Sequence, residues 1–482
     1  MTESMQQRAA RTALLVLALA LFILIPAKIV SYGYLPGDDA LRHSAYAVTD
    51  RTWGDIMLLN PELRPENDGQ AGWNSFLKAV HKLTDWGPTK LVDFSVILAF
   101  VTFTVAGLVA SGNPPAWLLA CAAIAIIEPA TFAKLLLGRP LFLTMSTVVV
   151  LTFIWMRDRP LPWRLEWAAV FLALAVDVTA HSSAWYLWVI AIPPLVVCRR
   201  WASLRIFVTA WIAAVGVACV ANGLYNGVVA PVMGLQLGIL QATTFRSNLV
   251  SELQPSGGPW FTLFVGVVII AIKCLRGSAF RAELFRVDVC FVIVAWTLGL
   301  YVGRFWVEWG LPAFAVWLTL EIRDALHVNT SGLARPTETV GVFLLATAIF
   351  YLSETVDTRG RYTNALRNPM MWAPANEIDA ELPEKGGILY STDMGVFYTL
   401  FHRFPNAHFR YALAMEAGAM PPEDQKVYRA VQSTGKLEEY KPWFDKMTPK
   451  DRILIQQATK PEWPGIEFRK FFSGWMGRKT AP

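Results

Sequence analysis

Two adjacent aspartates, Asp38 and Asp39, follow the first apolar segment of the chain and are the residues best suited to chemistry. Adjacent carboxylates repel one another and burial opposes their charge, so such a pair is usually held by a cation, a hydrogen-bond network or a chemical task. Helix capping is the simpler alternative, because Pro36-Gly37 forms a turn and either aspartate can cap a helix over 40–48. The dipeptide alone favours capping, and its place in the whole chain favours chemistry.

Further ionisable side chains interrupt the apolar segments, where charge is costly and each such residue is a functional candidate. They are Glu128, Lys134, Arg139, Asp177, His181, Arg304 and Glu308. On the expected topology all of them except Asp177 lie near the outer leaflet, level with the acid pair. Each has an ordinary explanation too: basic residues snorkel to headgroups, and Arg304 and Glu308 have the spacing of an ion pair on one helix. Their grouping favours function, because cations bind a phosphate and an acid handles a hydroxyl.

The composition is that of a membrane protein. The 482 residues are 54% hydrophobic and 17% charged, well beyond the apolar fraction of a soluble globular protein. The net charge of +6 does not indicate nucleic-acid binding, because the basic residues form short clusters between apolar runs. Neither a disulfide framework nor a cysteine-based zinc site is expected, because all cysteines fall in or beside apolar segments. They are Cys121, Cys198, Cys219, Cys274 and Cys290.

Runs of up to about 20 apolar residues predict about 11 membrane-spanning helices. They are centred on 13–29, 91–110, 116–127, 141–156, 165–179, 184–197, 206–220, 260–272, 287–303, 306–320 and 340–352. The first is expected to be retained, since no small-residue cleavage site follows it. Basic clusters then mark the cytoplasmic side, which places the N-terminus in the cytoplasm and the C-terminal segment outside. The clusters are Arg8 and Arg11; Arg157, Arg159 and Arg164; Arg199, Arg200 and Arg205; Lys273, Arg276, Arg281 and Arg286; and Arg323 and Arg335.

Three segments share the outer face on this topology. The loop 31–90 carries the acid pair and an apolar pattern of helical spacing, which predicts an amphipathic helix along the membrane surface. The glycine- and asparagine-rich segment 222–258 is a candidate for a mobile loop over a cleft. The tail alternates patterns of strands, expected over 387–390, near 408–412 and over 452–455, with patterns of helices, expected near 395–404 and 423–431. Such alternation is typical of a small α/β domain, and we expect this domain to act as a lid or docking surface. The predicted domains are a transmembrane domain over 1–354, including the loop, and an extracytoplasmic α/β domain over 355–482.

This arrangement resembles the GT-C superfamily of polyprenyl-phosphate-dependent glycosyltransferases, such as protein O-mannosyltransferases and the lipid A aminoarabinose transferase. The resemblance rests on the many spans, the long first outer loop with amphipathic helices, the acidic pair Asp38-Asp39 shortly after the first helix, and the outer C-terminal domain. The chain departs from oligosaccharyltransferases, because only Glu128 lies near the place of their second acidic pair and the tail lacks a Trp-Trp-Asp signature. Transfer of a single sugar is therefore expected rather than transfer of an oligosaccharide block.

The resemblance implies an inverting reaction at the extracytoplasmic face of the cytoplasmic (inner) membrane. A carboxylate, Asp39 in preference to Asp38, takes a proton from the hydroxyl of a glycan, lipid or protein acceptor. That hydroxyl attacks the anomeric carbon of a sugar on a polyprenyl phosphate, and cations such as Lys134, Arg139 or Arg304 stabilise the leaving group. His43 follows Asp39 by four residues and shares its helix face, so it could orient that carboxylate.

The substrate-binding residues expected from this resemblance lie in both the loop and the spans. They are Arg42, His43, Lys134, Arg139, His181, Arg304 and Glu308. No cofactor is implied with certainty, and a divalent metal held by Asp38, Asp39 and His43 stays an open alternative. No nucleic-acid partner is expected.

Two other classes of function stay open. A flippase or transporter of lipid-linked sugars needs functional groups near the bilayer midplane, where only Asp177 lies on the expected topology. A non-catalytic membrane scaffold would use the tail as its active part and the acid pair as a helix cap.

Overall fold

The computed structural model describes residues 5–61, 70–157, 159–221, 259–330, 336–415 and 417–480, so the segment 222–258 lies outside the described residues. The chain groups into two units. Of the described residues, those within 5–32, 94–221 and 259–359 form the helical unit, and those within 33–93 and 360–480 form the α/β unit. The long first loop thus falls in one unit with the C-terminal segment.

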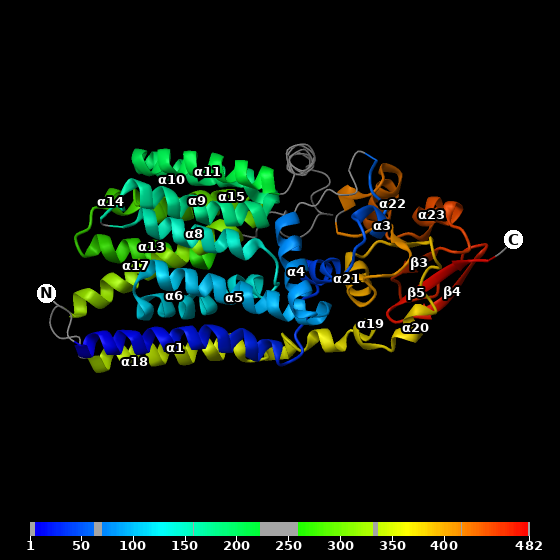
Figure 1. Ribbon diagram of the computed structural model, residues 1–482, viewed down its shortest axis with the longest axis horizontal. Coiled ribbons are helices and arrows are strands. Elements are labelled where there is room, and N and C mark those ends of the chain that lie inside the picture. The colour runs from blue at the N-terminus through cyan, green and yellow to red at the C-terminus, as the bar shows by residue number, and fades with distance from the viewer. Residues whose placement is uncertain are drawn as a thin grey trace. The chain divides into compact units, whose positions relative to one another are not determined.

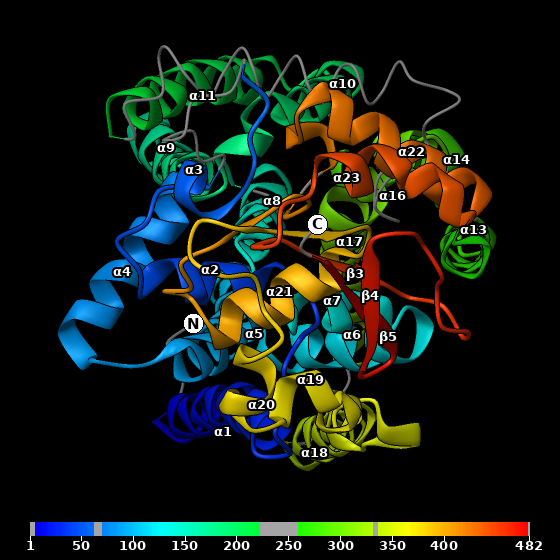
Figure 2. The same cartoon turned by 90° about the vertical axis from the view of Figure 1, so that its right-hand side faces the viewer.

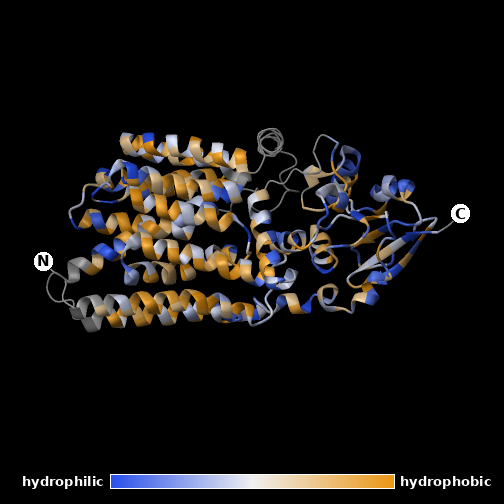
Figure 3. Cartoon of the chain, viewed as in Figure 1, coloured by the Kyte–Doolittle hydropathy of each residue, from blue (hydrophilic) through white to orange (hydrophobic). Residues whose placement is uncertain are grey.

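The helical unit is built of apolar helices (Figure 3). Its elements are α1 (Met5–Val30), the main part of α5 (Pro88–Ser111), α6 (Pro114–Ile127), α7 (Ala130–Leu135), α8 (Leu141–Trp155), α9 (Trp163–Ala180), η1 (Ser182–Ala191), α10 (Ile192–Val197), α11 (Trp201–Ala221), α13 (Trp260–Leu275), α14 (Phe280–Leu284), α15 (Val287–Gly299), α16 (Gly303–Phe305), η5 (Trp306–Gly310), α17 (Leu311–Thr330), α18 (Pro336–Thr355) and η6 (Thr358–Gly360).

Three of the described helices are long and apolar enough to cross a membrane, over Thr12–Val30, Pro88–Ser111 and Trp201–Ala221. Shorter apolar helices of 10–17 residues are Pro114–Ile127, Leu141–Trp155, Trp185–Val197, Trp260–Leu275, Val287–Gly299 and Val340–Thr355. Many apolar side chains point outward: Val220 is 86% exposed and Leu275 88%. Water disfavours such a surface and lipid accepts it, so the chain is a membrane protein. The expected number of about 11 spans is not confirmed.

Small residues and tryptophans set the helix packing. In Figure 1 α1 and α18 run side by side, and α6 contacts both α17 and α18. A Cβ at Gly107 would lie 2.0 Å from the ring of Trp117, so only glycine lets α5 and α6 approach so closely. The same ring donates from Nε1 to the carbonyl of Thr104 at 2.8 Å, which satisfies its polar atom within the bundle.

Two predicted spans are not regular α-helices. The span expected over 184–197 is a 3₁₀ segment, η1, followed by the short helix α10, which begins beside Pro193-Pro194. The span expected over 306–320 opens with a turn of π-helix, η5, before α17 continues. Such irregular turns are uncommon, and π-helical turns are frequent at functional sites.

The α/β unit contains one five-stranded mixed sheet. Its elements are α2 (Asp39–Ala47), α3 (Trp53–Ile56), α4 (Ala71–Thr84), η7 (Asn364–Arg367), α19 (Pro369–Trp372), α20 (Ala375–Asp379), β1 (Ile388–Ser391), α21 (Met394–Arg403), β2 (Arg410–Tyr411), η8 (Ala417–Ala419), α22 (Pro422–Thr434), η9 (Leu437–Tyr440), α23 (Lys441–Lys446), β3 (Arg452–Ile455), β4 (Ile466–Phe471) and β5 (Gly474–Lys479). The strand order is β2-β1-β3-β5-β4. The first three strands are parallel, and β5 joins β3 and β4 in antiparallel pairs.

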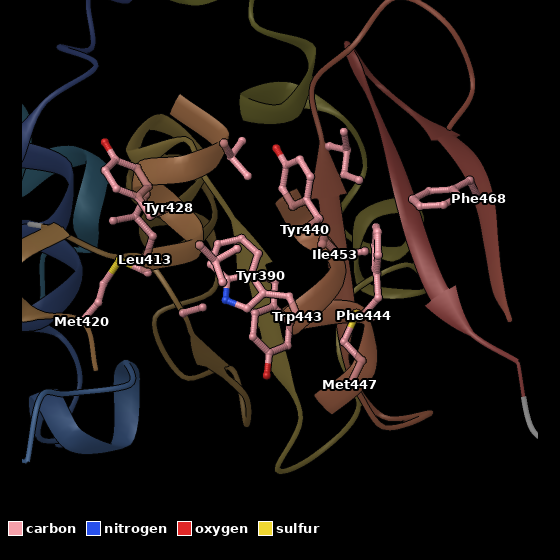
Figure 4. Close-up of a cluster of buried hydrophobic side chains, with 14 residues drawn as sticks. Tyr390, Leu413, Met420, Tyr428, Tyr440, Trp443, Phe444, Met447, Ile453 and Phe468 are labelled. Atoms are coloured by element: carbon pink, nitrogen blue, oxygen red, sulfur yellow. The ribbon is translucent and has the colours of Figure 1, made fainter. Parts of the chain in front are cut away.

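Aromatic side chains from the helices and strands fill the core of this unit (Figure 4). Tyr390 of β1 packs on Trp443 of α23 with ring centroids 5.4 Å apart. Phe444 of the same helix faces Phe468 of β4 at 6.3 Å, which covers the antiparallel part of the sheet. A buried aromatic ring removes a large apolar area from water, so these contacts hold the helices on the sheet.

The first loop is part of this fold. Met57 pairs with Tyr411 in a parallel bridge beside β2, and the amide of Leu58 donates to the carbonyl of Tyr411 at 2.8 Å. The amide of Asn60 donates to the carbonyl of Ala419, also at 2.8 Å. The loop therefore covers the edge of the sheet at β2. Helix α2 of the loop lies along α21 of the tail (Figure 2).

Candidate functional site

The acid pair lies at the N-terminus of α2, and its two members have different surroundings. Asp38 is the N-cap of α2, and its Oδ1 accepts a hydrogen bond from the amide of Asp39 at 2.6 Å. Asp39 is the first residue of the helix, where the helix dipole favours a negative charge. Capping and chemistry are therefore compatible here, because one aspartate caps the helix while the other points its carboxylate elsewhere.

Asp39 is held by two donors that meet at one carboxylate oxygen. Nε of Arg42 lies 2.8 Å from Oδ1 of Asp39, and Tyr398 of α21 donates its hydroxyl to the same oxygen at 3.0 Å. The Asp39 side chain keeps 16% of its surface exposed, whereas that of Arg42 keeps 7%. Burial, and next the charge of Asp39, raise the pKa of Tyr398 well above its usual value, so its phenol stays a donor. The structure thus fixes the carboxylate and leaves part of it accessible.

His43, which the sequence suggests as a group that orients Asp39, makes a close contact with α4. It is fully buried, and its Nδ1 lies 2.6 Å from Oδ1 of Asn74 in α4. That contact joins α2 to α4, whereas the partners assigned to Asp39 are Arg42 and Tyr398. Arg42, three residues after Asp39, is a neighbour that the spacing argument did not single out, because a long guanidinium reaches the carboxylate from position i+3.

A pair of tyrosines packs together, one of them just before the acid pair in the chain. Tyr34 and Tyr362 meet edge to face with ring centroids 5.7 Å apart, and the guanidinium of Arg361 lies 4.9 Å from the centre of the Tyr362 ring. Burial raises the pKa of Tyr34 above its usual range, with Asp38 adding to the rise and Arg361 opposing it. The C-terminal segment therefore supplies Tyr398 to Asp39 and packs Tyr362 on Tyr34, four residues before Asp38.

The helical unit gathers a second set of predicted residues. His181 follows α9, Arg304 lies in α16 and Glu308 in η5. Nη2 of Arg304 lies 3.0 Å from Nε2 of His181, and its Nε donates to the carboxylate of Glu308. The four-residue spacing of the arginine and glutamate had indicated such a pair. His181 and Glu308 are buried, and Arg304 is 18% exposed at its side chain.

Asp177 joins this set, contrary to the expectation that it lies apart. Thr144 of α8 donates its hydroxyl to Oδ1 of Asp177 at 2.7 Å, and its Oγ1 lies 3.0 Å from Nδ1 of His181. Trp188 of η1 donates from Nε1 to the other carboxylate oxygen at 2.7 Å. Asp177 belongs to the last turn of α9, which ends just before His181, so both face the same neighbours. Thr144 and Trp188 carry no charge, and sequence reasoning missed them for that reason.

The remaining predicted cations lie near one short helix. Lys134 belongs to α7, Arg139 follows it, and both are half-buried. Gly138 has φ +64° and lets the chain turn between α7 and α8. Glu128 is the C-cap of α6 and accepts a bond from Thr262 at 3.4 Å.

Some basic residues taken as topology signals prove to be part of an ion network. Lys273 lies 2.8 Å from Glu283 and 3.1 Å from Glu321, while Arg286 lies 2.7 Å from the fully buried Asp288. Arg286 also contacts Glu283 at 3.2 Å and donates to Glu321. The network joins α13, α14, α15 and α17. The sequence does not predict this network, because a carboxylate near a helix end gives the same sequence pattern whether it is paired with a cation or solvated.

The side chains that a metal ion would need are not grouped in the described part of the chain. There, no cluster of three or more histidine, cysteine, aspartate or glutamate side chains is placed to hold an ion. Asp39 is instead bonded to Arg42 and Tyr398, and His43 to Asn74. These partners do not fit a metal held by Asp38, Asp39 and His43, so no step of a reaction is derived through one.

Comparison with known proteins gives matches in structure alone. No protein-family model and no curated protein matches the chain. Two structures of the Archaeoglobus fulgidus oligosaccharyltransferase match at 12% sequence identity. The apo form has a TM-score of 0.47, with 94% of this chain and 70% of that one covered. The form tethered through a disulfide bond with an acceptor peptide containing the NVT sequon has a TM-score of 0.46, with 92% and 68% covered. Scores below 0.5 do not establish a common fold, and the assignment to a glycosyltransferase class stays a proposal.

Proposed function

We propose that the chain is a GT-C-type glycosyltransferase that moves one pentose or hexose from a polyprenyl phosphate to a hydroxyl group of a glycan, lipid or protein. The observation that carries this proposal is the carboxylate of Asp39, fixed by Arg42 and Tyr398 at the start of α2. A general base must be held within reach of the proton that it removes, and two donors on one oxygen hold Asp39 in this way.

The proposed reaction balances with this single base. Asp39 takes the proton of the acceptor hydroxyl as that oxygen attacks the anomeric carbon from the face opposite the phosphate. The new carbon–oxygen bond forms while the bond from the anomeric carbon to the phosphate oxygen breaks, which inverts the configuration. The lipid phosphate leaves as an anion and needs no general acid, and the proton on Asp39 passes to solvent.

Lys134 and Arg139 are the proposed partners of the lipid phosphate. Both are half-buried basic residues at a break between apolar helices, where a cation can meet a headgroup anion. A phosphate that leaves with more negative charge than it had in the donor is stabilised most by cations already in place. Replacing either residue with Gln should therefore weaken donor binding about tenfold, the loss of one charge-assisted hydrogen bond.

The proposed orientation puts the N-terminus in the cytoplasm and the α/β unit outside the inner membrane. It rests on the basic clusters between the apolar segments. A reporter enzyme that is active only outside the cytoplasm, fused to the C-terminus, should be active. Activity confined to a fusion at Arg199-Arg200 would overturn this topology.

Paired substitutions in the acid pair test the proposed base. Asp39→Asn keeps the size and removes the proton acceptor, so transfer should fall by about 10²–10⁴-fold. Asp38→Asn keeps the cap, since asparagine caps helices about as well as aspartate, and should lose far less. The measurement is sugar transfer by purified wild-type and variant proteins, with donor and acceptor identified from the envelope glycans lost in a deletion strain. Normal expression of Asp39→Asn together with undiminished transfer would defeat the assignment.

Transport of a lipid-linked sugar is a second candidate, which the buried chain of Asp177, Thr144 and His181 favours. Chains of ionisable residues inside a bundle are typical of transporters. Movement of a fluorescent polyprenyl-phosphate sugar across vesicles containing the purified protein, with no product formed in the presence of acceptors, would support transport over transfer.

A further inference from the structure

The hydrogen bonds around His181 have only one consistent set of donors. Arginine can only donate, so Nε2 of His181 accepts from Arg304 and the proton of the neutral imidazole lies on Nδ1. Thr144 gives its hydroxyl proton to Asp177 and therefore accepts from Nδ1 of His181. The donors thus run in one direction from Arg304 through His181 and Thr144 to Asp177. Each member fixes the orientation of the next, and Trp188 fixes Asp177 at the far end.

The charge of this cluster does not suit a phosphate. Arg304 contributes one positive charge, and the carboxylate of Glu308, which accepts a hydrogen bond from Arg304, contributes one negative charge when it is ionised. Asp177 is the second acid of the cluster, and His181 is neutral. The net charge of the four side chains is therefore negative when both acids are ionised, and zero when one of them is protonated. A phosphate would therefore meet at least as much repulsion as attraction, in contrast to the site of Lys134 and Arg139.

The same cluster suits a neutral hydroxylated group. A hydroxyl donates one hydrogen bond and accepts others, so a guanidinium beside a carboxylate can satisfy both roles. Tyr186 of η1 is half-buried, and Phe305 packs on Trp309 with centroids 6.0 Å apart. Aromatic rings with a few fixed polar groups are the usual composition of a small-molecule binding site.

We propose that Arg304 and Glu308 bind hydroxyl groups of the sugar carried by the lipid, and that Asp177, acting through Thr144 and His181, is a positioning residue for this pair. The proposal rests on the proposed function and deepens it, because it assigns the sugar and the phosphate of the donor to different residues. It also changes the role expected for Arg304, from phosphate binding to sugar binding.

Binding of two kinds of probe to the full chain in lipid nanodiscs tests the assignment. One probe is undecaprenyl phosphate, and the others are undecaprenyl-phosphate-linked pentoses and hexoses. Glu308→Gln should weaken the sugar-bearing probe about tenfold and leave undecaprenyl phosphate unchanged. Thr144→Val, which keeps the shape and removes the hydroxyl, should weaken the same probe about threefold to tenfold. Thr144→Ser keeps the hydroxyl and is the matched control, expected to bind as the wild type does.

Each other outcome contradicts a definite part of the proposal. Equal weakening of both kinds of probe in Glu308→Gln would make the cluster part of the phosphate site. If Glu308→Gln binds the sugar-bearing probes as tightly as the wild type, Glu308 does not bind the sugar. If a folded Thr144→Val does so, Asp177 does not position the pair through Thr144. If the wild-type protein binds undecaprenyl phosphate and binds no sugar-bearing probe more tightly than that, this inference is overturned while the proposed function stands. A wild-type protein that binds none of the probes overturns the proposed function as well.

Discussion

Acidification should loosen the contact between α2 and α21, because it favours protonation of His402. This buried histidine lies on α21, with Nδ1 3.2 Å from Oγ of Ser44 and Nε2 3.3 Å from Oγ1 of Thr89. Burial lowers the pKa of His402 from 6.5 to about 4, because a charged imidazole would lose its hydration there. The folded protein therefore keeps His402 neutral over a range of pH in which the unfolded chain binds a proton.

The sign and size of the effect follow from linkage. The unfolded chain holds more protons below pH 6.5, so the stability contributed by neutral His402 is complete above that pH and is lost as the pH falls toward about 4. The two pKa values differ by 6.5 − 4, or about 2.5 units. At about 1.4 kcal/mol per unit, this contribution is on the order of 3 kcal/mol.

Hydrogen exchange of the α21 amides measures this contribution locally. The comparison is between wild type and His402→Gln at each pH from 7 to 4, since intrinsic exchange cancels between them. The opening free energy of the wild type should fall by about 3 kcal/mol relative to the variant across this range. His408→Gln, which changes an exposed histidine of the same unit, should follow the wild type. Wild-type and His402→Gln profiles that stay parallel throughout would refute the reasoning.

Two further changes test the acid site and the ion network. Tyr398→Phe removes a donor to the carboxylate and should lower the turnover number about tenfold with little change in KM. Tyr440→Phe is the control: its hydroxyl lies 3.3 Å from that of Thr392, and transfer should be unchanged. Asp288→Ala removes one of the three carboxylates bonded to Arg286 and should cost about 1.5–3 kcal/mol, seen as a lower melting temperature of the solubilised chain. The control for that change is Asp324→Ala, in an exposed ion pair, which should alter the melting temperature little.

The parallel part of the sheet could be predicted from the sequence, and the antiparallel part could not. The predicted strand at 452–455 matches β3, and the strand at 387–390 matches β1 within one residue, because both are short apolar runs between turns. β4 was missed, since it carries Glu467, Arg469 and Lys470. It is one of the two edge strands of the sheet, where charged residues are common and conceal the apolar alternation.

The candidate site was predictable as far as local spacing determines it. The cap at Asp38 and the pairing of Arg304 with Glu308 follow from positions one and four residues apart. Tyr398 reaches Asp39 from 359 residues further along the chain, and Thr144 reaches Asp177 from 33 residues before it. No periodicity records such contacts, because they depend on how separate helices pack.

These long-range contacts change the role expected for the C-terminal segment. A lid or docking surface would leave the acid pair intact when removed. Here α21 supplies Tyr398 to Asp39 and His402 to Ser44, so the first loop and the tail depend on each other for their buried polar groups. The hydrogen bond from the amide of Leu58 to the carbonyl of Tyr411 also joins the loop to the tail. Loop and tail thus form one folding unit, and the position of Asp39 is a property of both ends of the chain.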